Sequence, residues 1–477
     1  MPRNPMQILV IYRNAMPLSA TRLTMLHHLR ALEYSDPQHQ ITYYNCGEAG
    51  SLKDTASITS SLMPSELTTR GYDGVVLHYS FLSMRNLGLP FYVWKRRFEW
   101  IRDLQCPKVA IPQDEGSFAA VLDEWLCELG VSAILSVHYA PTGPLYPIMR
   151  ERANILRCLP GYIDEGSADE IADWVLPIRS RATDIVYRAR RLPYHVGSAG
   201  SLKAHVADVI AARAGSFGLT TDISTREEDV VRGSDWLAFL ASGRAVIGAE
   251  GGYSAIDWHG ETRAQMREIL KADPTLAFEE ASARMPTGWD SYRLLTITPR
   301  HFEAIMARTC QVLVEGEYSG ILESERHYIP LRRDCSNVAE VLAQLRDHDR
   351  IQRMVDRCYR DICQSGDYTY RKFAKLIENA LLERRPAEEM VRTVKSGQER
   401  HRELEILERQ IIAERHYSVM LQAMLPDLLK EIVDRTPRRV ADFLWSRALK
   451  LVKRILLGFA AVAVVGVGAY LAYHLIW

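Results

Sequence analysis

The chain has 477 residues, enough for two core-forming domains and additional segments. Its 59 basic and 59 acidic side chains give a formal net charge of zero, which argues against a nucleic-acid-binding protein. The eight cysteines are scattered and form no CxxC pair, so we expect reduced thiols and no structural zinc site. The first residues hold only a short apolar run, so we expect no signal peptide.

Short apolar runs alternate with helical segments in the first part of the chain. Each run has the length of a strand and each intervening segment the length of a helix, as in βαβ units around a parallel sheet. The expected strands are residues 8–12, 40–46, 72–80, 107–116 and 131–138. We therefore predict an N-terminal Rossmann-like domain over residues 1–170.

The same alternation restarts in the second part of the chain. A polar, helix-forming segment at residues 262–284 interrupts it. The expected strands are residues 183–189, 217–223, 245–250, 310–315 and 327–331. We predict a second Rossmann-like domain over residues 171–380, so the fold class is α/β with two tandem Rossmann-like domains.

The last part of the chain has a different composition. A charged helical segment is expected over residues 381–454, and residues 455–477 carry no formally charged side chain if His474 is neutral. A helix of that length spans about 34 Å, which covers a hydrocarbon core of roughly 30 Å. Residues 435–454 hold seven basic side chains and one acidic one, a bias typical of the cytoplasmic side. We predict a single-pass C-terminal membrane anchor at 455–477, with a buried core helix as the alternative.

The phrase Glu-Gly-x-Tyr-Ser-small-Ile occurs twice, each time directly after an expected strand. It begins once at Glu250 and once at Glu315. Open parallel sheets bind ligands at the carboxyl ends of their strands, and glycine lets a ligand approach the backbone closely. We predict that Glu250, Gly251 and Glu315 line a binding cleft. The alternative is that both glutamates cap helices.

Polar residues also follow two expected strands in the N-terminal half. His78 follows one strand, and Gln113, Asp114 and Glu115 follow another. Consecutive polar side chains at a strand end are costly to bury unless they face a cleft or each other. A histidine at such a place can act as a general base, because its usual pKa is near neutrality. For His78 the alternative is a structural, hydrogen-bonded histidine.

A basic cluster lies at the start of the second half. Arg188, Arg190, Arg191 and Lys203 surround a Gly-Ser-Ala-Gly-Ser loop that precedes a helix. Fixed cations, glycines and a helix amino terminus together suit a diphosphate. The loop matches neither GxxxxGK[ST] nor GxGxxG, which argues against a P-loop NTPase and against classical NAD binding. The alternative is a solvated basic surface.

These motifs together resemble GT-B glycosyltransferases, and more closely a bacterial family-1-type group related to spore-maturation CgeB-like transferases. The similar segments lie within residues 5–380 and include YDGVVLHYS, VAIPQDE, DIVYRARRLPYHVG and AVIGAEGGYSAIDWHGE. The most specific one is RHFEAIMARTCQVLVEGEYSGILESERHYIPLRRD. The resemblance implies a cleft between two Rossmann-like domains, a nucleotide-diphosphate sugar as donor, no required cofactor and no metal.

The resemblance also implies roles for residues of the donor side. Glu303 would hold the nucleotide ribose, and Arg188 and Lys203 would bind phosphate, with Arg190 beside them. The residues that would line the donor sugar and diphosphate are Glu315, Gly316, Tyr318, Ser319 and Gly320.

On the acceptor side the resemblance implies that His78 and residues 113–115 face the acceptor. We expect His78, Asp114 and Glu315 to be the catalytic residues. Many retaining members carry a second glutamate eight positions before the ribose-binding one, where this chain has Leu295. Retaining and inverting outcomes therefore both stay open.

We expect a glycosyltransferase, of the hexosyltransferase class, that moves a sugar from a nucleotide-diphosphate sugar to a glycan or lipid-linked acceptor. It would work at the cytoplasmic face of the inner membrane. Residues 386–429 would form a helical spacer, or else a surface for partners or a homo-oligomer. Two alternatives stay open: a nucleotide-sugar epimerase of the same fold, and a membrane-tethered, non-catalytic scaffold.

Overall fold

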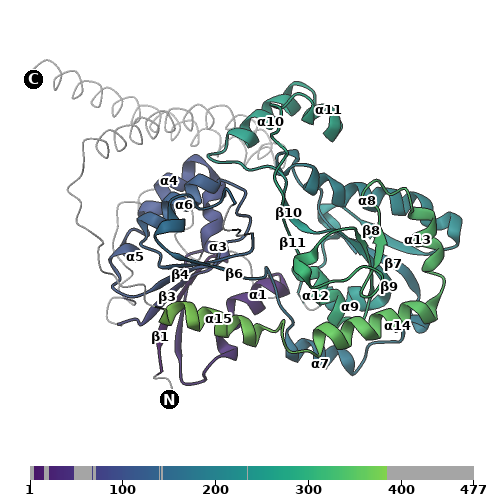
Figure 1. Cartoon of the computed structure of the whole chain (residues 1–477), viewed down its shortest axis with the longest axis horizontal. Helices are drawn as coiled ribbons and strands as arrows, with labels where there is room; N and C mark the ends of the chain where they lie inside the picture. Colours follow the sequence, from purple (N-terminus) through teal and green to yellow (C-terminus); the bar gives the residue numbers. More distant parts are fainter. Residues whose placement is uncertain are drawn as a thin grey trace, which may run out of the picture. The chain divides into compact units, whose positions relative to one another are not determined.

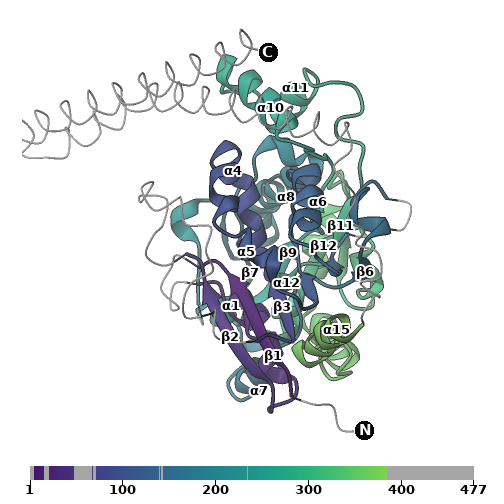
Figure 2. The ribbon, with the colours of Figure 1, turned by 90° about the vertical axis from the view of Figure 1, so that its left-hand side faces the viewer.

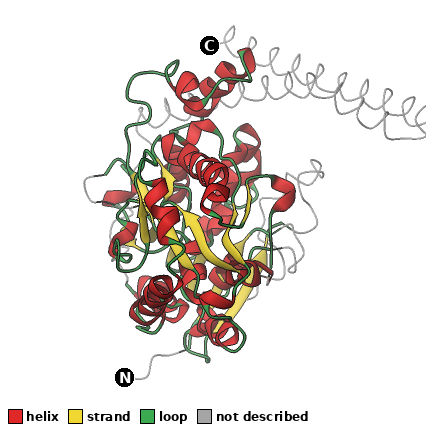
Figure 3. Cartoon of the chain, turned by 90° about the vertical axis from the view of Figure 1, so that its right-hand side faces the viewer, coloured by secondary structure: helices red, strands yellow, loops and turns green. Residues whose placement is uncertain are grey.

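Two parallel sheets form the framework of the protein. The computed structural model describes residues 5–14, 21–47, 67, 71–138, 140, 143–233 and 235–383. Both sheets belong to one compact unit, Met1–Val391. Helices lie on either side of the strands, as Figure 3 shows. The predicted membrane anchor at 455–477 and the segment 384–454 lie outside the described residues.

The N-terminal sheet has six strands in the order β2-β1-β3-β4-β5-β6, and all neighbouring pairs are parallel. Its central strands β3, β4 and β5 are buried along their whole length and mostly apolar, because helices cover both faces. The strands are β1 (Gln7–Tyr12), β2 (Gln40–Asn45), β3 (Gly74–Leu77), β4 (Lys108–Ala110), β5 (Ala133–Ser136) and β6 (Asn154–Arg157). The helices between them are α1 (Leu23–Leu29), α3 (Tyr79–Leu82), α4 (Leu89–Arg96), α5 (Trp100–Asp103) and α6 (Ala119–Glu128).

The C-terminal sheet has five strands in the order β13-β12-β9-β7-β8, again all parallel. The strands are β7 (Thr183–Arg188), β8 (Thr221–Ser224), β9 (Gly243–Gly248), β12 (Cys310–Val314) and β13 (Ile329–Leu331). Its helices are α7 (Glu165–Ala172), α8 (Ser198–Ala214), α9 (Asp235–Ser242), α12 (Pro299–Met306), α13 (Val338–Gln344) and α14 (His348–Cys358). The predicted α/β class with parallel sheets is confirmed.

A hairpin with two helices is inserted between β9 and β12. It consists of β10 (Gly251–Tyr253), α10 (Glu261–Ala272), α11 (Phe278–Ser282) and β11 (Leu294–Thr296), and β10 pairs with β11 in antiparallel fashion. Ile256 and Leu294 of this insertion belong to the hydrophobic core of the N-terminal sheet. The insertion, which we call the bridging hairpin, therefore connects the two sheets.

The last described helix, α15 (Tyr370–Leu382), packs on the N-terminal sheet rather than on the C-terminal one. Its buried side chains Phe373, Ile377 and Leu381 share one core with β1 and β3, and Figures 1 and 2 show α15 beside β1. The predicted second domain ran to residue 380, so its last segment lies against the first sheet. We call the N-terminal sheet with its helices and α15 the N-terminal lobe, and the remainder the C-terminal lobe.

Within the residues that the structure describes, no helix combines the length and the apolar character needed to cross a membrane.

Candidate functional site

The two Glu-Gly phrases lie side by side in the C-terminal sheet. β9 and β12 are neighbours with Ala245 opposite Cys310, an offset of 310 − 245 = 65 residues. The phrases have the same offset, since 315 − 250 = 65. The repeat in the sequence therefore coincides with the register of the sheet.

The two phrases also contact each other. The backbone N–H of Tyr318 donates a hydrogen bond of 2.8 Å to Glu250, which is buried. A Cβ on Gly316 would lie 2.5 Å from the other Glu250 carboxylate oxygen, so only glycine fits there. Glu250 and Gly316 thus hold the two turns together. The prediction that Glu250 binds the donor is wrong, because its carboxylate is buried in this contact.

The turn after β12 is only partly open to a ligand. Tyr318 is completely buried, and its hydroxyl donates to the Val314 carbonyl at 2.5 Å, so it cannot line a donor sugar as predicted. Ser319 has a φ of 57° and shares a hydrogen bond of 3.0 Å with the Thr296 hydroxyl. By contrast, Glu315 is exposed at the end of β12.

Contacts within the protein hold the Arg188 side chain. Its guanidinium forms an ion pair of 2.6 Å with Asp222 and donates to the backbone carbonyl of Asp229 at 3.1 Å. The ring of Phe239 lies 4.5 Å from the guanidinium carbon. These contacts bind Arg188 to the neighbouring strand β8 and to α9, and the phosphate role of Arg188 stays a prediction.

The amino terminus of α8 is already occupied by the protein itself. The Ser198 N–H donates to the Asp290 carboxylate at 3.0 Å, and the Ala199 N–H donates to the Ser254 hydroxyl at 3.0 Å. Both acceptors belong to the bridging hairpin, and they approach Gly197, whose φ is 90°. The Gly-Ser-Ala-Gly-Ser loop therefore does not offer its first N–H groups to a diphosphate in this structure.

Cations nevertheless gather at the carboxyl ends of both sheets. Desolvation, followed by the charges of Arg190 and Arg300, lowers the pKa of Arg22. Desolvation and the charge of Arg300 lower the pKa of Lys203 to about 8, against the opposing effect of Asp114. We call the set the cation cluster; its members are Arg22, Arg190, Arg232, Arg300 and Lys203.

Few carboxylates neutralise the cation cluster. Glu227 lies 3.6 Å from Arg190 and 3.7 Å from Arg232. Among the described residues no ion pair is formed by the other three members. Such unpaired cations favour an anion with several negative oxygens.

Arg300 has a fixed position in the cation cluster. Its guanidinium lies 5.2 Å from the Trp236 ring and donates to the Arg188 carbonyl. Lys203 lies next to Gly251, the first residue of β10, where a Cβ would be 3.8 Å from the ammonium nitrogen. Arg300 comes from α12 and Lys203 from α8, so two different helices of the C-terminal lobe supply these charges.

Asp114 lies opposite the cation cluster, after β4 of the N-terminal lobe. It is exposed, and its backbone has a φ of 53°, a left-handed conformation that is uncommon for aspartate. Its charge raises the pKa of Lys203. Gln113 next to it donates to the Pro160 carbonyl at 3.0 Å. The roles predicted for Asp114 and Lys203 stay predictions.

Two other predicted residues of the N-terminal lobe face its core. Glu115 is completely buried and accepts hydrogen bonds from the Ser136 hydroxyl at 2.5 Å and the Val137 N–H at 2.8 Å. His78 is also buried; its ring accepts from the Ser80 N–H at 3.2 Å, and burial lowers its pKa well below the usual value. The predictions that they face an acceptor are wrong, because both side chains stabilise the ends of strands.

Glu303 connects the two lobes. Its carboxylate accepts from the Trp236 indole N–H at 2.6 Å and from the hydroxyl of Thr24, which belongs to α1 of the N-terminal lobe. The side chain is buried. A nucleotide ribose would have to replace Thr24 at this carboxylate, so the predicted ribose contact is not preformed.

Five residues of this region are absent from the sequence-based predictions, among them Arg232 of the cation cluster. Arg22 and Arg300 belong to the cation cluster, and Arg85 and Tyr253 contact the Asp114 loop. Arg22 follows β1, and Arg300 lies in the first turn of α12. A systematic listing of the basic residues near strand ends would have found both arginines. The role of Arg85 could not be read from the sequence, because its hydrogen-bond partners are backbone carbonyls.

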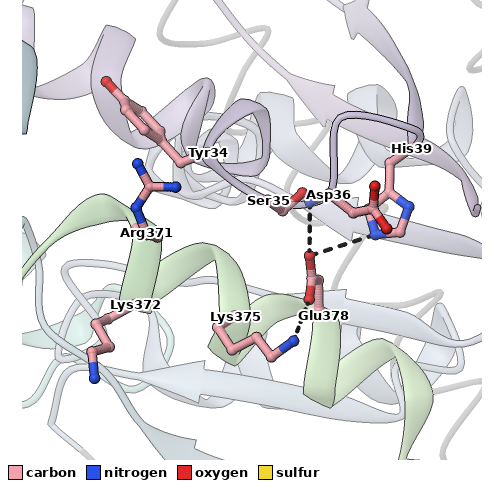
Figure 4. Close-up of a pocket in the computed structure, with 8 residues that line it drawn as sticks. All are labelled: Tyr34, Ser35, Asp36, His39, Arg371, Lys372, Lys375 and Glu378. Atoms are coloured by element: carbon pink, nitrogen blue, oxygen red, sulfur yellow. Dashed lines mark hydrogen bonds and ion pairs between the residues drawn. The ribbon is translucent and has the colours of Figure 1, made fainter. Parts of the chain in front are cut away.

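A surface pocket of about 390 Å³ lies at the opposite end of the N-terminal sheet, between α15 and the segment that leads into β2 (Figure 4). Glu378 pairs there with Lys375 at 3.1 Å and with His39 at 3.5 Å. The His39 contact attaches α15 to the segment before β2. Within the described ranges no three or more His, Cys, Asp or Glu side chains are arranged to hold a metal ion.

Comparison with known protein families gives no match, and neither does comparison with curated proteins. Among solved structures, an α-glucosyltransferase in complex with UDP and DNA is 9% identical, with 80% of this chain and 100% of that chain covered and a TM-score of 0.43. HepE of Anabaena in complex with UDP and glucose is 11% identical, with 80% and 100% covered and a TM-score of 0.40. AviGT4, a glycosyltransferase of avilamycin A biosynthesis, is 12% identical, with 79% and 97% covered and a TM-score of 0.37. At these scores the likeness carries no argument about the chemistry of this chain.

Proposed function

We propose that this chain is a glycosyltransferase of the GT-B type that transfers a sugar from a nucleotide-diphosphate sugar to an acceptor hydroxyl. The observation that carries the proposal is the pair of cations at the strand ends of the C-terminal lobe: Lys203 lies beside Gly251, and Arg300 is held at the Trp236 ring. Among the described residues neither cation forms an ion pair, and the charge of Asp114 from the N-terminal lobe acts on Lys203. This arrangement suits a donor that carries a diphosphate and an acceptor that must lose a proton.

In the reaction the acceptor oxygen forms a bond to the anomeric carbon of the sugar. The bond between that carbon and the diphosphate breaks, and its electron pair leaves with the diphosphate. Lys203, Arg300, Arg190 and Arg22 stabilise the charge that develops on this leaving group. Asp114 accepts the proton of the acceptor hydroxyl. The exposed Glu315 contacts the donor sugar.

The finer features of the proposal come from the sequence. The motif pattern supports membership of the CgeB-like group and a hexose as the transferred sugar. The apolar segment 455–477 and the basic residues before it support anchoring at the cytoplasmic face of the inner membrane. An acceptor at that surface is a glycan or a lipid-linked glycan. Residues 386–429 would serve as a spacer, or as the contact of a homo-oligomer.

The proposal is tested with sugar-labelled UDP-glucose, UDP-galactose, UDP-N-acetylglucosamine and GDP-mannose, each incubated with the full chain and a bacterial membrane fraction. We expect label from one donor to move to an acceptor. The variant Arg300→Ala lowers kcat/KM by roughly 10–100-fold, because one cation at the leaving group is lost. The matched control is Arg102→Ala, an exposed arginine on α5 that pairs with Asp103 at 3.4 Å.

The same assay separates the alternatives. With an epimerase the label stays on the nucleotide while the identity of the sugar changes. A non-catalytic scaffold gives neither result, and Lys203→Ala then leaves the cellular phenotype intact while deletion of residues 386–429 removes it. Lack of transfer from every donor, together with lack of nucleotide binding, contradicts the proposal.

A further inference from the structure

The loop that carries Asp114 is fixed from beneath by a buried arginine. Arg85 is completely buried, and its guanidinium donates to the carbonyls of Ser117 at 2.9 Å and Gln113 at 3.0 Å. It also donates to the carbonyl of Asp114 itself at 2.7 Å. No carboxylate forms an ion pair with Arg85 among the described residues. Its bonds therefore serve the shape of the loop, including the left-handed backbone at Asp114.

The bridging hairpin holds the same loop from the other lobe. The Asp257 N–H donates to the Gly116 carbonyl at 2.8 Å, and the Ala119 N–H donates to the Asp257 carbonyl at 2.9 Å. The ring of Tyr253 lies flat against Gly116, where a Cβ would be 2.9 Å from the ring. A residue of the C-terminal lobe thus lies against the backbone two positions beyond Asp114.

The Tyr253 ring packs beside Asp114, because it lies against Gly116 of the same loop, and the charge of Asp114 acts on its hydroxyl. Burial, followed by the charge of Asp114, raises the pKa of Tyr253 above its usual value. The phenol therefore keeps its proton at neutral pH and is able to donate it to a carboxylate oxygen.

We propose that Arg85 and Tyr253 are positioning residues for Asp114, Arg85 through the backbone of the loop and Tyr253 through the carboxylate. The inference rests on the proposed transferase function. Since Tyr253 belongs to the insertion of the donor-binding lobe, Asp114 is oriented towards the acceptor hydroxyl only when the two lobes are in contact. Removal of the acceptor proton by Asp114 therefore depends on contact with the lobe that binds the donor.

The variant Tyr253→Phe tests this inference, since it keeps the ring against Gly116 and removes only the hydroxyl. The donor is whichever of UDP-glucose, UDP-galactose, UDP-N-acetylglucosamine and GDP-mannose gives transfer with the unaltered chain. We expect kcat to fall about tenfold or more, because the orientation of the base is lost, while KM for the donor changes less than about twofold. In single turnovers, Tyr253→Phe combined with Asp114→Asn should be no slower than Asp114→Asn alone.

The control is Tyr194→Phe, which removes a hydroxyl that donates to the Leu276 carbonyl at 3.3 Å, away from Asp114. We expect it to leave kcat and KM unchanged. Arg85→Lys is a second variant, and its folding is checked first by thermal unfolding, because Arg85 is buried; a folded Arg85→Lys protein should lose kcat with the donor KM retained.

Unchanged kcat in Tyr253→Phe overturns the inference while the transferase function stands. A fall in kcat that is accompanied by an equally large rise in donor KM overturns it as well. A further loss in the double variant also overturns it, since Tyr253 then acts independently of Asp114. Absence of transfer and of donor binding in the unaltered chain removes the proposed function and this inference together.

Discussion

Gly316 shows how a single residue fixes the relation between two strand ends. Its missing side chain leaves room for the buried Glu250 carboxylate, which in turn accepts from the Tyr318 N–H at 2.8 Å. The repeated phrase is therefore explained first by packing. Its glutamates differ in role, because Glu250 is buried and Glu315 is exposed.

Gly316→Ala should destabilise the protein by roughly 1–3 kcal/mol, because the new methyl group would lie 2.5 Å from the Glu250 carboxylate. The free energy of unfolding is measured by urea denaturation. The control is Gly215→Ala, at a position with right-handed backbone and no neighbouring atoms within 4 Å of the added Cβ. Equal stabilities of the two variants would contradict the proposed contact.

Lys203 makes nucleotide binding depend on pH. Burial and Arg300 lower its pKa to about 8, so the free protein loses this positive charge as the pH rises through that value. A bound diphosphate favours the charged form. We therefore expect the Kd for UDP to be constant below about pH 7 and to rise by up to about tenfold per pH unit above 8.

Isothermal titration calorimetry from pH 6 to 9.5 measures this dependence. In Lys203→Met the dependence should disappear, and affinity should be low throughout. If Lys203→Met keeps the full pH dependence of the Kd for UDP, a different group is responsible for that dependence.

At the scale of elements, α12 joins the lobes through Glu303. The helix begins at Pro299 and presents Glu303 to Thr24 of α1 and to Trp236 of α9. The contact lies beside Arg300, one turn earlier on the same helix. A movement that separates the two lobes must therefore break the hydrogen bond between Thr24 and Glu303.

Thr24→Val should reduce the free energy of unfolding by about 1–3 kcal/mol, because it leaves one oxygen of a buried carboxylate without its donor. Thr221→Val on the exposed part of β8 is the control, and it should change stability by less than about 0.5 kcal/mol. Urea denaturation gives both values. If Thr24→Val is as stable as the unaltered chain, the hydrogen bond does not connect the lobes.

The alternation of strands and helices could be predicted because buried parallel strands are continuously apolar in the sequence. The place of the site at the strand ends follows from the same pattern. Which side chains face the cleft could not be predicted. His78 and Glu115 follow strands and yet point into the core, because Ser80 and Ser136 form hydrogen bonds with their side chains there. The partner of Arg188 could not be predicted either, because Asp222 lies 34 residues further along the chain.

For the whole molecule, one consequence of the topology is that the chain crosses between the lobes more than once. The bridging hairpin adds Ile256 and Leu294 to the core of the N-terminal lobe, and α15 returns to the N-terminal sheet. The sequence predicted two domains but not these connections, because they depend on contacts between segments far apart in the chain.

The central claim is that the cation cluster binds the diphosphate of a nucleotide sugar opposite Asp114. Calorimetric titration of the full chain at pH 7 with UDP, GDP, UMP and GMP tests it most directly. We predict that one diphosphate binds at least about tenfold more tightly than its monophosphate, and that Arg300→Ala removes this difference while Arg102→Ala keeps it. Equal affinities for diphosphate and monophosphate, or no binding of any of the four, would contradict the claim.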